Sequence, residues 1–234
     1  MSSLTQYKAD KIFATLLASE KMDVADGIAT SSTKIPPDST NRTILIGLGG
    51  TGVKTINYVK RTISDKLDPS WKDYIAFLAI DSDGKELSAA DSLTDDEYIR
   101  TTRNGIAERL ITPGKYPPAW HRFLDPDQAA KITDPNSEGS GQKRLLGKAK
   151  IHDQVRETGK AVDVEIVNKL ASRKNSLVSL AAGKGKYQVY VIGGISGGTG
   201  SGSFLEMPAL IRKVLGNGDN VSIYAMLFLP DTLT

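Results

Sequence analysis

The sequence contains no cysteine, so its 234 residues form neither a disulfide framework nor a thiolate metal site. Histidine is scarce too, with two residues, and no cluster with metal-ligand spacing occurs. The net charge of +3 is too small to favour nucleic acid as a partner. No apolar run approaches the roughly 18–20 residues of a membrane-spanning helix, and the N-terminal stretch lacks the pattern of a cleavable signal. We therefore expect a globular, cytoplasmic protein with no nucleic-acid partner and no membrane insertion.

The P-loop pattern G-x-x-x-x-G-K-[ST] is also absent, which excludes that class of nucleotide hydrolase. Instead, two glycine-rich segments each follow an apolar run and precede a helix pattern. Residues 193–202 read GGISGGTGSG, and residues 47–52 read GLGGTG. Backbone N–H groups crowd around an anion in such loops, and the helix that follows points its positive end at the same place. Because the carboxyl ends of parallel strands meet at one edge, we expect both loops to face one nucleotide phosphate chain.

Hydrophobic periodicity places the remaining elements. Strands are predicted at residues 43–46, 74–80, 189–192 and 221–229, and helices at 94–110, over much of 143–182, and at 201–215, where Pro208 should kink or shift the first turn. An amphipathic helix at 4–21 and a polar linker precede the core, and residues 112–135 form a proline-rich insertion. This alternation predicts an α/β fold with a mostly parallel sheet, divided into an extension (1–40) and a nucleotide-binding domain (41–234).

Two enzyme classes compete for the same motifs. Gly47, Gly49 and Gly52 satisfy the G-x-G-x-x-G dinucleotide fingerprint, and Asp81 or Asp83 could bind a ribose, as in an NAD(P)-dependent oxidoreductase. That fold has no use for a second glycine loop of such density. Residues 194–198 also match the G-x-S-x-G nucleophile elbow around Ser196. Hydrolases of that type place their histidine after the serine, whereas both histidines here precede it.

Several segments, in the same order along the chain, resemble the tubulin/FtsZ superfamily. Residues 193–202 resemble its GGGTG[ST]G signature, with Ser196 in place of the first glycine. Residues 47–52 resemble its first phosphate loop and residues 79–83 its second. Gly139-Ser140-Gly141, with the later Gly147-Lys148, resembles the third loop, and residues 227–230 resemble the start of the fifth.

The resemblance spans residues 43–234 and shows departures. Lys54 stands where many FtsZ proteins carry an asparagine, and the stretches at 88–138 and 151–186 are longer. These differences indicate a divergent prokaryotic tubulin-like protein. The family's second domain has no counterpart here, so we expect this chain to be the amino-terminal GTP-binding domain of a longer protein, or a reduced relative.

The resemblance implies a Rossmann-like three-layer domain that binds GTP or GDP, with Mg²⁺ held through phosphates and water. It also implies GTP hydrolysis and self-association into filaments by the complete protein, and little turnover by this chain, because no residue is a convincing general base. A non-hydrolysing scaffold is the alternative. The implied nucleotide contacts are Gly47, Gly49, Gly50, Thr51 and Gly52; Asp81 and Asp83 near the metal–water shell or ribose; Gly139, Ser140 and Gly141 near the γ-phosphate; and Ser196, Gly197, Gly198, Thr199, Gly200 and Ser201.

Overall fold

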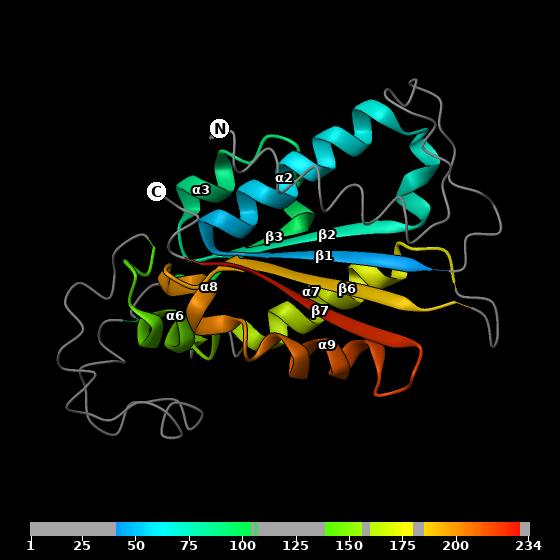
Figure 1. The fold of residues 1–234 in the computed structure, drawn as a ribbon. Helices are drawn as coiled ribbons and strands as arrows, with labels where there is room; N and C mark the ends of the chain where they lie inside the picture. The colour runs from blue at the N-terminus through cyan, green and yellow to red at the C-terminus, as the bar shows by residue number, and fades with distance from the viewer. Residues whose placement is uncertain (1–40, 104–105, 107–138, 156–159, 180–184, 230–234) are drawn as a thin grey trace.

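The computed structural model describes residues 41–103, 106, 139–155, 160–179 and 185–229. Five of its strands form one sheet in the order β3-β2-β1-β6-β7, and every neighbouring pair is parallel (Figure 1). The strands are β1 (Arg42–Leu48), β2 (Ile75–Asp81), β3 (Tyr98–Arg100), β6 (Tyr187–Gly194) and β7 (Val221–Phe228). The predicted α/β class and the four predicted strands are confirmed.

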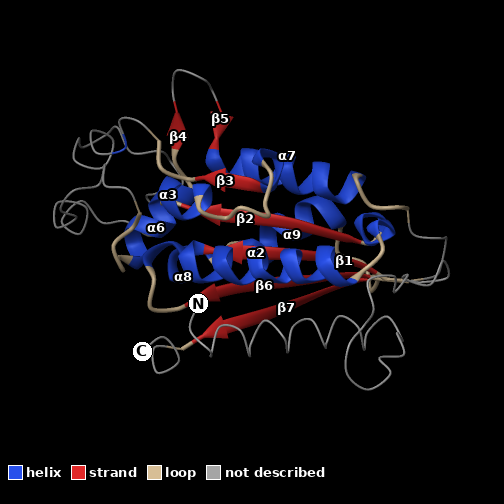
Figure 2. Cartoon of the chain, turned by 90° about the horizontal axis from the view of Figure 1, so that it is seen from above, coloured by secondary structure: helices blue, strands red, loops and turns tan. Residues whose placement is uncertain are grey.

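Helices cover both faces of this sheet and make a three-layer domain. One face carries α2 (Gly49–Lys66), the 3-10 helix η1 (Pro69–Asp73) and α3 (Gly84–Ser88). The other carries α6 (Arg144–Ile151), α7 (Val162–Asn175) and α9 (Met207–Leu215). Figures 1 and 2 show these two layers on either side of the strands. Each layer seals its own apolar core against the sheet.

The central strand β1 shows why an apolar run forms here. Leu45 points into the core under α2, while Ile44 and Ile46 point into the core under α7 and α9. All seven residues of the strand are buried. A strand of a parallel sheet is covered on both faces, so it needs a continuous apolar run rather than an alternating pattern.

The predicted helix at 94–110 is wrong in its first part. Thr94 and Glu97 form a capping box, a typical helix-start signal, yet only the 3-10 helix η2 (Asp95–Glu97) follows. The chain then enters β3, where Ile99 is buried and pairs with Ile80 of β2. Burial of a β-branched residue at the sheet edge outweighs the local helix signal. Apart from Ile106, residues 104–110 lie outside the described part of the chain.

The predicted helical region at 143–182 is two helices rather than one. Between α6 and α7 the chain forms a short antiparallel pair, β4 (Gln154–Val155) with β5 (Lys160–Ala161). The two helices pack on different partners, because α6 lies against α8 (Gly198–Ser203) and α7 lies against β2 and α9. A single straight helix cannot serve both surfaces.

Pro208 acts as predicted. The expected helix at 201–215 is divided into α8 and α9, and Pro208 lies in the first turn of α9. Its missing N–H costs little there, because the first turn of a helix has no intrahelical partner for it.

The N-terminal helix at 4–21, its linker and the insertion at 112–135 lie outside the described residues. Within the described ranges, no helix has both the length and the apolar character to cross a membrane.

Candidate functional site

The five strands of the main sheet all end toward α3, α6 and α8, as the arrows in Figure 2 show. At this carboxyl edge the loops after β1, β2 and β6 meet the loop before α6. They line an open-mouthed cavity of about 210 Å³, whose lining includes 11 of the predicted site residues and four others. The predicted ones are Gly49, Gly50, Thr51, Asp81, Asp83, Ser140, Gly141, Gly197, Gly198, Thr199 and Gly200, and the others are Leu48, Glu86, Gln142 and Gly194.

The loop after β1 turns directly into α2. Gly49 has φ of +67°, a conformation that a residue with a side chain adopts only under strain. Leu48 occupies the N-cap position and provides no side-chain hydrogen bond, and the first turn contains no acidic residue. The first N–H groups of this 18-residue helix, together with its positive dipole end, are therefore available to an anion in the cavity.

Gly47 and Gly52, two further predicted site residues, lie behind the cavity and pack against backbone. Neither lines the cavity. A Cβ on Gly52 would lie 2.3 Å from the carbonyl oxygen of Ile192, and a Cβ on Gly47 would lie 2.6 Å from the carbonyl oxygen of Gly52. These glycines let α2 pack directly on the backbones of β1 and β6. Their packing positions the loop that lines the cavity.

The loop after β6 forms the opposite wall. Gly197 is the N-cap of α8, makes no side-chain cap, and has open space where a Cβ would stand. Gly198 differs, because its Cβ would lie 2.6 Å from the Cβ of Ser140. Ser196 and Ser201 do not line the cavity. The hydroxyl of Ser201 donates to the carbonyl oxygen of Gly197 at 2.5 Å and so fixes the loop from behind.

The loop before α6 is a tight turn. Lys143 N donates to the carbonyl oxygen of Ser140 at 2.8 Å, and the two residues between them, Gly141 and Gln142, have φ of +50° and +62°. Positive φ at both central positions is the feature of a type I′ turn. The turn presents Ser140, Gly141 and Gln142 to the cavity, while Gly139 lies outside its lining.

Three buried hydroxyls join the loops beneath the cavity. Ser82 Oγ lies 2.9 Å from Ser140 Oγ and 2.6 Å from Thr199 Oγ1. Thr199 also donates to the Asp81 carboxyl, so in that arrangement the proton between Ser82 and Thr199 belongs to Ser82. The three loops therefore share one hydrogen-bond network. Ser82 is its centre, although the sequence analysis selected only the acids on either side of it.

Three carboxyl groups lie along one side of the cavity. Burial raises the pKa of Asp81 to about 6, against the opposing hydrogen bonds from the Thr199 hydroxyl and from backbone N–H groups. Asp83 caps α3 by accepting from Lys85 N at 2.9 Å. Glu86, which the sequence analysis missed, pairs with Lys54 at 2.9 Å. Among the described residues, no group of three acids or histidines is arranged to hold a metal ion by itself.

The nucleophile-elbow interpretation gains nothing from the described residues. His152 ends α6, and its Nε2 lies 3.4 Å from Glu206 Oε2. Glu206 also pairs with Lys148 at 2.9 Å. The partner of this histidine is therefore a carboxylate at the start of α9 and not Ser196; His121 lies outside the described part of the chain.

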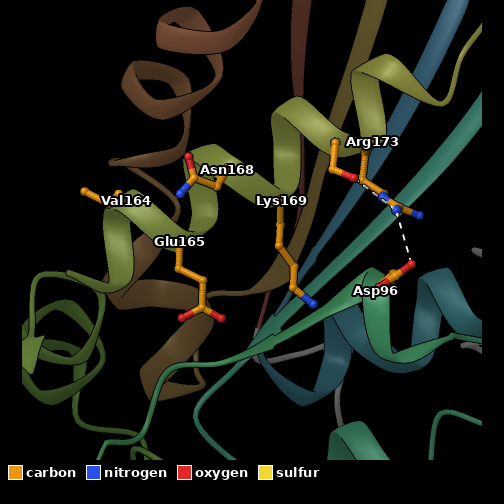
Figure 3. A pocket seen from close by; sticks show the side chains of 7 residues that line it. Asp96, Val164, Glu165, Asn168, Lys169 and Arg173 are labelled. Atoms are coloured by element: carbon orange, nitrogen blue, oxygen red, sulfur yellow. Dashed lines mark hydrogen bonds and ion pairs between the residues drawn. The ribbon is translucent and has the colours of Figure 1, made fainter. Parts of the chain in front are cut away.

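A second, open cleft of about 460 Å³ lies along the outer side of α7 (Figure 3). Its lining mixes both charges: Asp96, Val164, Glu165, Asn168, Lys169, Ser172 and Arg173. Lys169 Nζ donates to the carbonyl oxygens of Asp95 and Tyr98 at 2.7 and 3.0 Å, and Arg173 lies 3.8 Å from Asp96. These contacts join α7 to the segment before β3, so the charged groups of the cleft serve packing between the two.

Comparison with known proteins supplies the family. A family model described as "Tubulin like" matches residues 44–234. Among solved structures, CetZ1 from Haloferax volcanii, a GDP-bound monomer, has 15% identity and a TM-score of 0.47, over 81% of this chain and 42% of that one. CetZ2 from the same organism, a GTPγS-bound protofilament, has 19% identity and a TM-score of 0.39, over 80% and 39%. The chain thus spans less than half the length of either structure, and comparison with curated proteins gives no match. Because the family model covers most of the sequence, the chain belongs to the tubulin-like family.

Proposed function

We propose that this domain binds guanine nucleotide, GTP or GDP, with the phosphate chain in the glycine-lined cavity. The observation that carries the proposal is the meeting of two glycine loops, from β1 and β6, across one cavity at the start of an uncapped helix. Backbone N–H groups from both sides suit an anion with several oxygens better than any neutral ligand. Membership of the tubulin-like family supports guanine as the base.

Each wall then has a role. Gly49, Gly50 and Thr51 hold the phosphates from the side of α2, and residues 197–200 hold them from the side of α8. The turn at Ser140 and Gly141 faces the terminal phosphate. Gly47, Gly52, Gly139, Ser196 and Ser201 support these segments from outside the lining.

Magnesium fits the acidic side of the cavity. Asp81, Asp83 and Glu86 bring negative charge close to the phosphate position, and this charge repels a nucleotide unless a cation lies between them. We propose that Asp81 and Asp83 contact waters of a Mg²⁺ ion that the phosphates hold. When bound, the ion supplies charge neutralisation for the phosphate oxygens.

Hydrolysis and assembly belong to the proposal for the complete protein. We propose that it hydrolyses GTP and associates into filaments in the cytoplasm, as its family membership suggests. The described residues near the cavity offer hydroxyls, amides and acids suited to metal contacts, and none of them is placed as a clear general base.

Calorimetric titration of the chain with GTP, GDP, ATP and NAD in the presence of Mg²⁺ tests the binding. We expect heat from GTP and GDP and none from NAD. Binding of NAD without a response to either guanine nucleotide would replace the proposal with the dinucleotide-enzyme alternative.

Gly197→Val locates the site. Its side chain enters open space on the cavity wall without a protein clash, so we expect a folded protein whose affinity for GDP falls at least about tenfold, because the methyl groups displace phosphate oxygens. Ala225→Val, on the exposed outer part of β7, is the matched control and should bind as the wild type does. An unchanged affinity for GDP in Gly197→Val would show that the nucleotide does not bind in this cavity.

A further inference from the structure

Lys150 is a fully buried cation directly beneath the candidate site, and the proposed phosphate contacts do not include it. It lies on α6 with no exposed surface. Its Nζ donates to the carbonyl oxygen of Gly139 at 2.6 Å and to Thr102 Oγ1 at 3.1 Å. Burial of an ammonium group costs free energy unless its N–H groups are hydrogen-bonded. A buried lysine at this position therefore suggests a role beyond packing.

The contacts of Lys150 link three segments. The hydroxyl of Thr102 donates to the carbonyl oxygen of Ser82 at 2.6 Å, and Gly139 N donates to the same oxygen at 3.3 Å. Lys150 therefore connects the end of β2, the residues after β3 and the turn before α6. Removal of its ammonium would leave the Gly139 carbonyl and the Thr102 hydroxyl without this donor.

The orientation of one peptide group follows from this contact. The carbonyl of Gly139 points toward Lys150. In a planar trans peptide the next N–H points the opposite way, so the N–H of Ser140 is directed away from Lys150. Within the described residues, no hydrogen bond uses this N–H. Ser140 and Gly141 line the cavity, so this N–H is our candidate donor to a ligand bound there.

The positive charge of Lys150 also favours an anion at this turn, as the orientation of the Ser140 N–H does. The ammonium of Lys150 lies one peptide group behind the cavity wall and is shielded from water. Coulomb attraction is stronger in such surroundings than in solvent, so this cation favours negative charge at the turn. Lys60 is a second buried lysine of this protein; it lies on α2 and pairs with the carboxylate of Glu97.

We propose that Lys150 is a positioning residue that makes the site distinguish triphosphate from diphosphate. By holding the Gly139 carbonyl, it turns the Ser140 N–H toward the terminal phosphate and adds a positive charge behind it. This inference rests on the proposed nucleotide function and assigns to α6 a part in it beyond covering the sheet.

The test compares GTPγS with GDP in calorimetric titrations of the full chain. In Lys150→Met, affinity for GTPγS should fall about 10–100-fold, the loss expected for a charge-assisted hydrogen bond, while affinity for GDP should change less than about threefold. Lys60→Met also removes a buried lysine, but from the other layer. It should leave the ratio of the two affinities unchanged.

Two further measurements keep the test decisive. Thr102→Val keeps the Lys150 ammonium and nearly the size of side chain 102, but it removes one hydrogen-bond partner of Lys150. It should therefore move the ratio of the two affinities in the same direction by a smaller amount. This variant serves as the test even if Lys150→Met does not fold. Amide exchange of residues 139–142 should be faster in Lys150→Met, and unchanged in Lys60→Met, with no nucleotide present.

Equal losses for both nucleotides, or no loss, would overturn the proposal and leave Lys150 as a structural residue. If the wild type bound neither nucleotide, the proposed function would be wrong, and so would the proposed discrimination between triphosphate and diphosphate. The exchange measurement would still decide whether Lys150 anchors the turn.

Discussion

At the scale of single residues, the acid at the end of β2 shows how the fold sets the chemistry of the site. Asp81 is buried and connected through Thr199 to Ser82 and Ser140. An ionised Asp81 attracts the proton of Thr199, which then accepts from Ser82. The charge state of one carboxyl therefore sets the direction of hydrogen bonds that reach three loops.

This arrangement predicts a pH dependence of stability. The pKa of Asp81 is about 6 in the folded chain against 3.8 for the ordinary group. The protonated form stabilises the fold, fully below pH 3.8, and that contribution is lost as pH rises through about 6. Without nucleotide, Asp81→Asn should therefore gain stability over the wild type as the pH rises from 4 to 7, by about 3 kcal/mol at most. Urea unfolding at several pH values checks this, and a constant difference across that range would contradict it.

Glycines that look alike in the sequence divide into two kinds in the structure. Gly198 is one of the predicted nucleotide contacts, yet a Cβ there would first meet the side chain of Ser140. Gly197, one residue earlier, has open space instead. The direction of each Cα–H bond decides this, and a string of glycine letters carries no such direction.

At the scale of elements, α6 and α8 touch backbone to backbone. A Cβ on Gly147 would lie 2.1 Å from the carbonyl oxygen of Gly198, and a Cβ on Gly202 would lie 2.5 Å from that of Arg144. Because the two helices are in direct backbone contact, the turn at 140–142 and the loop at 194–198 are held in a fixed position relative to each other.

Gly202→Ala should separate this pair of helices. Because the new methyl group meets backbone rather than a flexible side chain, we expect a loss of about 1–3 kcal/mol in the free energy of unfolding. Weaker binding of GDP should accompany it, since the two walls of the cavity move apart. Gly218→Ala is the control, because its Cβ meets only the end of the Asn220 side chain in an exposed turn. Denaturant unfolding with calorimetry measures both effects; equal stability of the two variants would refute the packing argument.

The elements also show how far sequence patterns reach. The strands with long apolar runs were predicted, because β1, β2 and β6 are buried on both faces. The short β3 was missed, since its assignment depends on Ile99 pairing with a strand that local patterns cannot identify. In the candidate site, the glycine loops could be predicted from their sequence pattern. Ser82, Glu86 and Lys150 could not, because their contacts are with residues distant in sequence.

At the scale of the whole molecule, the cavity exists only in the folded chain. Its walls come from residues 48–51, 81–86, 140–142 and 194–200. An unfolded chain therefore offers no such site, and ligand binding must stabilise the fold.

GTP with Mg²⁺ at about 100 times its dissociation constant should raise the free energy of unfolding by about 2.7 kcal/mol. Denaturant titration with and without nucleotide measures the change, and NAD at the same concentration serves as the control. A stabilisation by NAD that matched that of GTP would argue against guanine-nucleotide specificity.

The position of β1 in the sheet has a consequence for synthesis on the ribosome. Its neighbours are β2, which follows closely in the chain, and β6, which begins at Tyr187. Translation from the end of β2 at Asp81 to Tyr187 covers about a hundred residues, or on the order of 5–20 s at the usual 5–20 residues per second. During that time one edge of β1, which is buried in the folded chain, lacks its partner strand. The nascent protein therefore presents a binding surface for chaperones well before it can present one for a nucleotide.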